Sequence, residues 1–100
     1  MEFLADMVTH VPEGTSESEV RHTKEREAIR AAELAEEGHL LRLWKPPVRP
    51  EEWRTLGLWR ADDEEQLLDV LASLPLHPWM TVGVTPLAPH PNDPGTSANQ

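Results

Sequence analysis

Lys24 and Glu27 are two residues of this sequence whose types and spacing could carry out proton-transfer chemistry. They lie three positions apart in RHTKEREAIRAAELAEEG (residues 21–38), which has the composition of a surface helix. At about 100° per residue, both charges fall inside the apolar stripe of that helix. The stripe is formed by Val20, Ala28, Ala31, Leu34 and Ala35.

The helical pattern leaves two interpretations of this pair open. A lysine and a glutamate at this spacing commonly form an ion pair at the edge of a buried face, with the lysine stem extended toward solvent. Alternatively, both side chains enter a pocket between helix and sheet. Burial would then raise the pKa of the carboxyl toward that of a general base, and the ammonium would stabilise negative charge.

Signals for other chemistries are weak in this sequence. It contains no cysteine, which excludes disulfides, thiolate nucleophiles and thiolate metal ligands. No glycine-rich phosphate loop or Ser/His/Asp signature is present. The five histidines form no His-x-x-x-His or similar pair, so neither a metal site nor a cofactor is expected: His10, His22, His39, His77 and His90.

Tryptophans and arginines supply candidates for binding a flat or anionic substrate. Four tryptophans can either wall an apolar pocket or fill the core or an interface: Trp44, Trp53, Trp59 and Trp79. Three arginines on the middle strands can anchor an anion, or on an open sheet face be solvated or paired across subunits: Arg42, Arg54 and Arg60.

Length and charge restrict the class of protein. One hundred residues suit a single small domain. The net charge of −9 argues against nucleic acid or an anionic membrane as a partner. No apolar run approaches the roughly 20 residues that span a bilayer. Because MEFLADM also lacks the features of a signal peptide, we expect a cytoplasmic protein.

The elements that must position these residues follow the order β-α-β-β-α-β. Strands are predicted at 2–10, 39–45, 53–61 and 80–87, with helices ending at Glu37 and spanning 62–75. Thr15 or Ser16 caps the first helix and Gly38 ends it, while Asp62 caps the second with Glu65 completing a capping box.

These elements predict an α+β, ferredoxin-like fold, in which a four-stranded antiparallel sheet carries two helices on one face. The other face is left bare, and any tryptophans there would need a ligand or a second subunit to cover them. Residues 1–92 are expected to form the single domain. The segment APHPNDPGTSANQ (residues 88–100) is proline-rich and polar, and residues 93–100 are expected to be an extended or disordered tail.

Several segments of the chain resemble the muconolactone delta-isomerase family. They are the opening MEFLADM, the VP loop after it, TKERE, EEGHLLRLW, SLPLHPWM and PLAPHP. The resemblance spans residues 1–92. Lys24 and Glu27 fall on the family's Lys-x-x-Glu, and residues 87–91 resemble its Leu-x-x-His-Pro.

The resemblance implies a cofactor-free isomerase of the intramolecular oxidoreductase type, acting in the β-ketoadipate pathway of aromatic catabolism. Such an enzyme shifts a double bond in a muconolactone-like butenolide by proton transfer. Glu27 would be the base, and Lys24 would stabilise the dienolate or hold the substrate carboxylate. Substrate-binding roles are expected for Trp44, Arg42, His90 and Trp79. The resemblance also implies a homo-oligomer, at least a dimer and in the family ten chains, with bare sheet faces and C-terminal segments in its contacts.

Three departures from the family pattern leave the substrate open. Leu40-Leu41 replaces the usual Trp-Arg, Pro89 stands where an arginine is common, and PPVRPEEW replaces a polar and aromatic link. Two anion-binding positions are therefore apolar or lost. The alternatives are isomerisation, cyclisation, dehydration or dehalogenation of another lactone or polyketide-like substrate, or a non-catalytic oligomeric binding protein.

Overall fold

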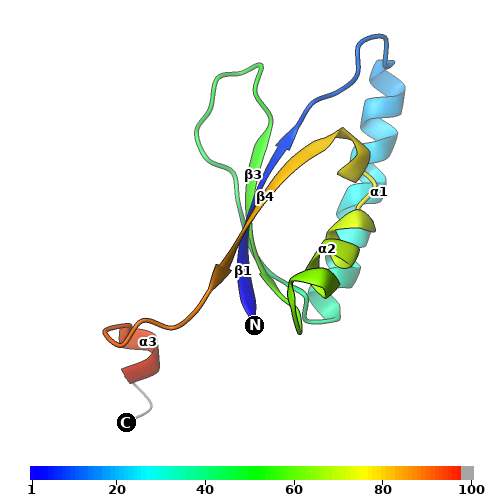
Figure 1. Ribbon diagram of the computed structural model, residues 1–100. Helices are drawn as coiled ribbons and strands as arrows, with labels where there is room; N and C mark the ends of the chain where they lie inside the picture. Colours follow the sequence, from blue (N-terminus) through cyan, green and yellow to red (C-terminus); the bar gives the residue numbers. More distant parts are fainter. Residues whose placement is uncertain (98–100) are drawn as a thin grey trace.

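The computed structural model describes residues 1–97, which form one antiparallel sheet with two long helices on the same face (Figure 1). The elements in chain order are β1 (Glu2–Thr9), α1 (Glu17–Glu36), β2 (Leu40–Trp44), β3 (Arg54–Arg60), α2 (Glu64–Ala72), the 3₁₀ helix η1 (His77–Trp79), β4 (Met80–Leu87) and the one-turn helix α3 (Pro94–Ser97). The strand order is β2-β3-β1-β4. The predicted ferredoxin-like fold is confirmed.

Helix α1 begins and ends where its capping residues predict. The Ser16 hydroxyl accepts a hydrogen bond from the Glu19 amide at 3.1 Å, which satisfies one of the free N–H groups of the first turn. Gly38 has a φ of 86°, the left-handed conformation typical of a residue that follows a helix. The sequence therefore predicted both ends of the helix that carries Lys24 and Glu27.

The predicted cap of α2 is wrong by one residue. Asp63, not Asp62, is the N-cap, and its carboxylate accepts a hydrogen bond from the Gln66 amide at 2.8 Å. Gln66 in turn accepts a hydrogen bond from the Asp62 amide at 2.6 Å. Gln66, rather than Glu65, therefore completes the capping interaction. The helix ends at Ala72 rather than at residue 75, since Pro75 disfavours helical geometry in the residue before it.

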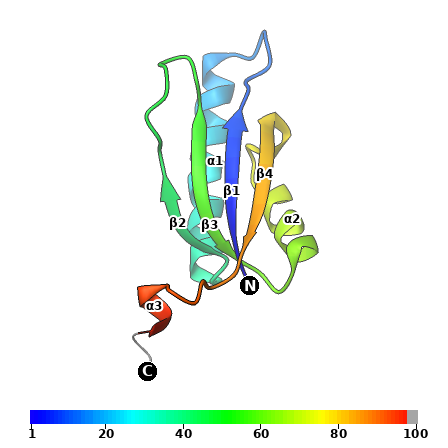
Figure 2. The same ribbon diagram turned by 60° about the vertical axis from the view of Figure 1, so that its left-hand side comes forward.

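The helix-covered face of the sheet carries the core. Phe3, Ala5 and Met7 of β1 are buried, and the first two pair across the sheet with Trp59 and Gly57 of β3. Figure 2 shows α1 behind β1 and β3, with α2 beside β4. The remaining large side chains of the core come from α1, β2 and the α2 region: Leu34, Leu40, Leu67, Leu71 and Leu74.

The apolar stripe predicted for α1 is only partly buried. Ala28 and Ala35 are exposed, whereas Thr23 is buried. The Thr23 hydroxyl donates a hydrogen bond to the Glu19 carbonyl at 2.8 Å, so a polar residue can occupy this position without a lost hydrogen bond.

The opposite sheet face carries ion pairs within the chain. Arg54 binds Asp6 through two hydrogen bonds of 2.9 and 2.6 Å, and Arg60 lies 3.2 Å from Glu2. The Asp6 pKa is lowered, chiefly by its hydrogen bonds with Arg54. No helix of the described chain covers this face (Figure 1).

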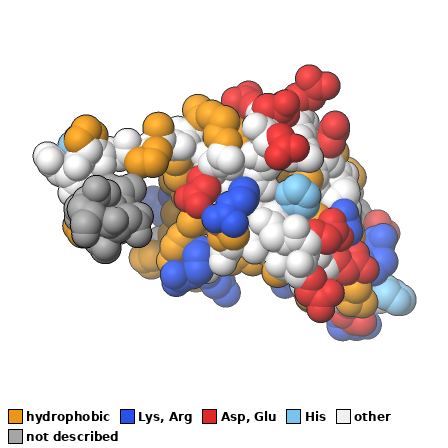
Figure 3. Space-filling model, turned by 90° about the horizontal axis from the view of Figure 1, so that it is seen from below, with side chains coloured by type: hydrophobic (Ala, Val, Ile, Leu, Met, Phe, Trp, Pro, Cys, Tyr) orange, Lys and Arg blue, Asp and Glu red, His pale blue; other side chains and the backbone are white. Residues whose placement is uncertain are grey.

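Acidic side chains gather over the helical side of the molecule when it is seen from below (Figure 3). Glu64 and Glu65 lie in the first turn of α2, where the helix dipole favours negative charge. Near the end of α1, the Arg30 guanidinium lies 3.0 Å from Glu33 and 3.6 Å from Glu37. Arg30 therefore offsets part of the negative charge of these two acidic side chains.

The C-terminal segment departs from the predicted extended or disordered tail in one respect. Residues 94–97 form the helix α3, which lies apart from the sheet (Figure 1). The remainder of that prediction, residues 98–100, lies outside the described residues. None of the helices within residues 1–97 is long and apolar enough to cross a bilayer.

Candidate active site

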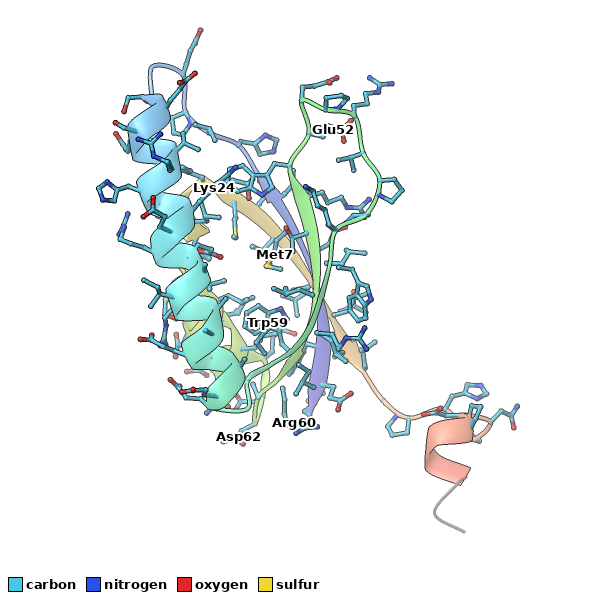
Figure 4. The ribbon with its side chains drawn as sticks, turned by 180° about the vertical axis from the view of Figure 1, so that it is seen from behind. Met7, Lys24, Glu52, Trp59, Arg60 and Asp62 are labelled. Carbon is cyan, nitrogen blue, oxygen red and sulfur yellow. The ribbon has the colours of Figure 1, made fainter. Side chains whose placement is uncertain are left out.

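A cavity of about 250 Å³ lies between α1 and the helix-covered face of the sheet. Its walls are mostly apolar, and its polar lining comes from Lys24, Glu27, Thr9 and Thr55. Figure 4 shows Lys24, Met7 and Trp59 between the helix and the strands. A largely apolar cavity with a few convergent polar groups is the usual form of a site for a small organic ligand.

Lys24 and Glu27 enter this cavity because residues three apart lie on the same face of a helix. The small side chains of Ala28 and Ala31 also line it and leave room beside the charged groups. No ion pair joins Lys24 to Glu27 within the described chain. Of the two interpretations that the sequence left open, the structure places the pair in a pocket.

Glu27 is half-buried and held by a backbone donor. Its Oε1 accepts a hydrogen bond from the Leu76 amide at 2.9 Å. Burial raises the pKa of the carboxyl above its ordinary value of 4.5, while the Leu76 hydrogen bond and the nearby His77 oppose this shift. The net result is a carboxyl that gains a proton more readily than one in water.

The Lys24 ammonium lies over an aromatic ring rather than beside a carboxylate. Its Nζ is 4.7 Å from the centroid of the Trp53 ring, a geometry that attracts a cation to the negative face of the ring. Trp53 lies directly before β3 and also lines the cavity. This contact keeps the ammonium at the cavity without neutralising it.

Trp59 is a cavity residue to which sequence reasoning assigned no specific role. It is 1% exposed and belongs to the core as well as to the cavity lining. Its indole Nε1 is buried and has no hydrogen-bond partner within residues 1–97. The residue type alone gives no signal for this, because the sequence contains four tryptophans.

The other predicted substrate-binding residues lie outside this cavity in the single chain. Arg42 stacks on Trp44, with 5.1 Å from the guanidinium carbon to the ring centroid, and both alternate with the cavity-lining Leu43 along β2. Trp79 lies in η1. His90 follows β4, where its Nδ1 accepts a hydrogen bond from the Asn92 amide at 2.9 Å. Substrate binding by these four residues stays a prediction.

Two positions that differ from the family pattern also have defined places. Leu40 is buried and lines the cavity, and Leu41 lies at the irregularity where the pairing of β2 with β3 shifts register. Pro89 is exposed beyond the end of β4.

Among the described residues, no three histidine, aspartate or glutamate side chains group closely enough to hold a metal ion.

Fold and site together define a small ferredoxin-like protein with a carboxyl group and an ammonium in one apolar cavity. The family model of muconolactone delta-isomerase matches residues 1–93. The chain therefore belongs to the muconolactone delta-isomerase family, as its sequence segments predicted.

Individual relatives agree with this assignment. The muconolactone Delta-isomerase of Cupriavidus pinatubonensis (strain JMP 134 / LMG 1197) is 29% identical over 92 residues, which cover 92% of this chain and 97% of the relative. A crystal structure of muconolactone isomerase matches with a TM-score of 0.83 and 26% identity, covering 94% of this chain and 95% of that one.

A third protein shares the fold alone. The 5-chloro-2-hydroxyhydroquinone dehydrochlorinase of Burkholderia phenoliruptrix AC1100 matches with a TM-score of 0.61 over 88% of this chain and 94% of its own, at 8% identity. This fold therefore also occurs in a protein of different chemistry.

Proposed function

We propose that this protein is a cofactor-independent isomerase that shifts a double bond in a butenolide of the muconolactone type by proton transfer. The observation that carries the proposal is the position of Lys24 and Glu27, which line one apolar cavity in a member of this family. A base and a cation in a largely apolar site are the two groups that such a proton shift requires.

Glu27 acts as the base in this proposal. The Leu76 amide occupies Oε1, so Oε2 takes the acidic ring proton. The electrons of the broken C–H bond form a dienolate, and the same proton returns to the other allylic carbon as the double bond moves. Burial raises the pKa of Glu27, which makes the carboxylate a stronger base toward the ring proton than an exposed one.

Lys24 supplies the positive charge. Its ammonium lies at the cavity over Trp53, where it can either stabilise the dienolate or hold the substrate carboxylate. The Lys24 side chain is exposed, so water weakens either interaction relative to one in a closed site.

The departures at Leu41 and Pro89 bear on which butenolide is used. Neither position supplies the positive charge that the family pattern places there. We therefore propose a lactone or enone whose binding depends less on a carboxylate, with muconolactone as the first compound to test. Neither the fold nor the cavity favours one of the other reactions that the sequence left open.

The activity is tested by mixing the purified protein with muconolactone and following its isomerisation by absorbance. We expect a rate above the uncatalysed one. The methyl ester of muconolactone should react as well if the lost anion-binding positions reflect a less acidic substrate. No turnover of either compound at high enzyme concentration would reject the butenolide substrate.

Self-association belongs to the same proposal. Ile29 is 63% exposed on α1 and Trp44 is 41% exposed on the open sheet face, and a second copy of the chain would cover such side chains. Sedimentation velocity should give a particle larger than a monomer. A stable monomer at micromolar concentration would contradict this part of the proposal.

A further inference from the structure

We propose that the indole N–H of Trp59 donates a hydrogen bond to the carbonyl oxygen of the ligand in the Lys24–Glu27 cavity. The catalytic role of this hydrogen bond rests on the proposed proton shift. Its contribution to ligand binding can be measured without turnover. It assigns the ligand a neutral carbonyl group, as in a lactone or an enone.

The unpartnered indole nitrogen is the first observation. Trp59 Nε1 is buried and has no hydrogen-bond partner within residues 1–97, although the side chain is among the largest that are fully buried. An indole N–H is a donor only, and buried tryptophans usually find an acceptor. The missing acceptor is explained if a ligand supplies it.

The position of the nitrogen is the second observation. A Cβ atom built on Gly57 would lie 2.4 Å from Trp59 Nε1 and 3.2 Å from both the Leu43 Cδ2 and the Met7 Cε. Leu43, Met7 and Trp59 all line the cavity. The indole nitrogen therefore fills the space that a side chain at residue 57 would occupy, next to two side chains of the cavity wall.

The chemistry of the wall decides what kind of acceptor fits. Met7 and Leu43 beside the nitrogen are apolar, and the indole carries no charge. Such surroundings suit a neutral carbonyl oxygen better than a carboxylate, which loses more hydration on burial. When Glu27 removes a ring proton, this oxygen gains negative charge, and a fixed N–H donor stabilises the charge as it develops. Lys24 is then free to hold a carboxylate.

Two matched ligands test this inference on the unmodified protein. One is a saturated γ-butyrolactone with an acetic acid arm, which has no double bond to shift. The other is tetrahydrofuran acetic acid, which has the same ring and arm without the carbonyl. In calorimetry, we expect the lactone to bind about threefold to tenfold more tightly, the range for one net hydrogen bond to a neutral group.

Variants assign that preference to the indole nitrogen. Trp59→Phe removes the N–H and should bring the two affinities to within about twofold of each other. Replacement of Trp59 by benzothienylalanine keeps the shape of the ring system and should do the same if the phenylalanine variant folds poorly. Leu67→Val is the matched control, because Leu67 is a core residue outside the cavity lining. It should lower stability and keep the lactone preference.

The outcomes separate this inference from the proposed function. Equal affinity of the two ligands for the unmodified protein would overturn the inference, as would a preference that survives the loss of the N–H. Glu27→Gln should keep the preference, because the carbonyl contact does not need the base. A preference for the lactone in a protein without turnover would reject the isomerase and retain the Trp59 contact.

Discussion

The carboxyl group of Glu27 accepts a hydrogen bond from the backbone amide of Leu76, with 2.9 Å between the nitrogen and Oε1. The two residues lie 49 positions apart, so the bond joins the middle of α1 to the turn between α2 and η1. A donor to a carboxylate favours its ionised form, whereas burial disfavours it. Burial is the larger effect here, because the pKa of Glu27 is raised. The bond therefore orients the carboxyl without removing its basicity.

Removal of the carboxylate should abolish the proposed turnover. In Glu27→Gln the amide oxygen can still accept the Leu76 hydrogen bond, but the side chain no longer acts as a base. We expect kcat to fall by about a hundredfold to ten-thousandfold, measured by absorbance with muconolactone. Glu25→Gln is the control, since Glu25 is exposed on the same helix and does not line the cavity. Equal activity of the wild type and Glu27→Gln would remove Glu27 from the mechanism.

The raised pKa of Glu27 predicts the acid side of the pH–rate profile. Only the ionised carboxylate can accept the ring proton, so kcat/KM should fall as the pH drops through the pKa of Glu27 in the free enzyme. Because burial raises that pKa above 4.5, the midpoint of this fall should lie above 4.5. A midpoint below the ordinary value would contradict the assignment of Glu27 as the buried base.

The same shift predicts how stability changes with pH. A carboxyl with a raised pKa binds its proton more tightly in the folded state, so its contribution to the free energy of unfolding is lost as pH rises through the folded pKa. Glu27→Gln removes this loss. The melting temperature of Glu27→Gln minus that of the wild type should therefore rise from about pH 4 to about pH 8. Taking the difference between the two melting temperatures cancels the contribution of Asp6, whose lowered pKa changes stability with pH in the opposite direction. A difference that does not depend on pH would contradict the shift.

Replacement of Lys24 should distinguish its two possible roles. Lys24→Met keeps the apolar stem, and Lys24→Arg keeps the charge near Trp53. If the ammonium holds a carboxylate, Lys24→Met should raise KM for muconolactone about tenfold or more, leave its methyl ester nearly unaffected, and be partly rescued by arginine. An equal loss of kcat on both compounds would assign Lys24 to the dienolate. Unchanged kinetics with both compounds would exclude it from the site.

Local sequence signals predicted the elements that bear the site. The strand predicted at residues 2–10, the Ser16 cap and Gly38 defined β1 and α1, and helical spacing placed Lys24 and Glu27 on one face. These signals involve residues within one helix turn or one strand, so the sequence contains them directly.

Contacts between distant residues were not predictable in the same way. The Leu76 amide that binds Glu27 is a backbone group, and no side-chain type marks its role. Trp59 and Gly57 lie two residues apart on one face of β3, but their types do not show that Leu43 of β2 and Met7 of β1 close the same space. The cap of α2 was wrong by one residue because Asp62 and Asp63 are equally suitable cap residues, and only the local hydrogen bonds of Gln66 distinguish them.

A methyl group at Gly57 should disturb the cavity, whereas one at Gly83 should not. The Cβ of Gly57→Ala would lie 2.4 Å from Trp59 Nε1, so the indole must move. Overpacking of this kind costs about 1–3 kcal/mol of stability, and the displaced ring should also lower lactone affinity. No heavy atom lies within 4 Å of the corresponding position at Gly83 in β4, so Gly83→Ala should change stability by less than about 1 kcal/mol. Thermal unfolding and calorimetry measure both effects. Equal stability of the two variants would mean that the indole does not pack over Gly57, and the cavity wall described around Trp59 would be wrong.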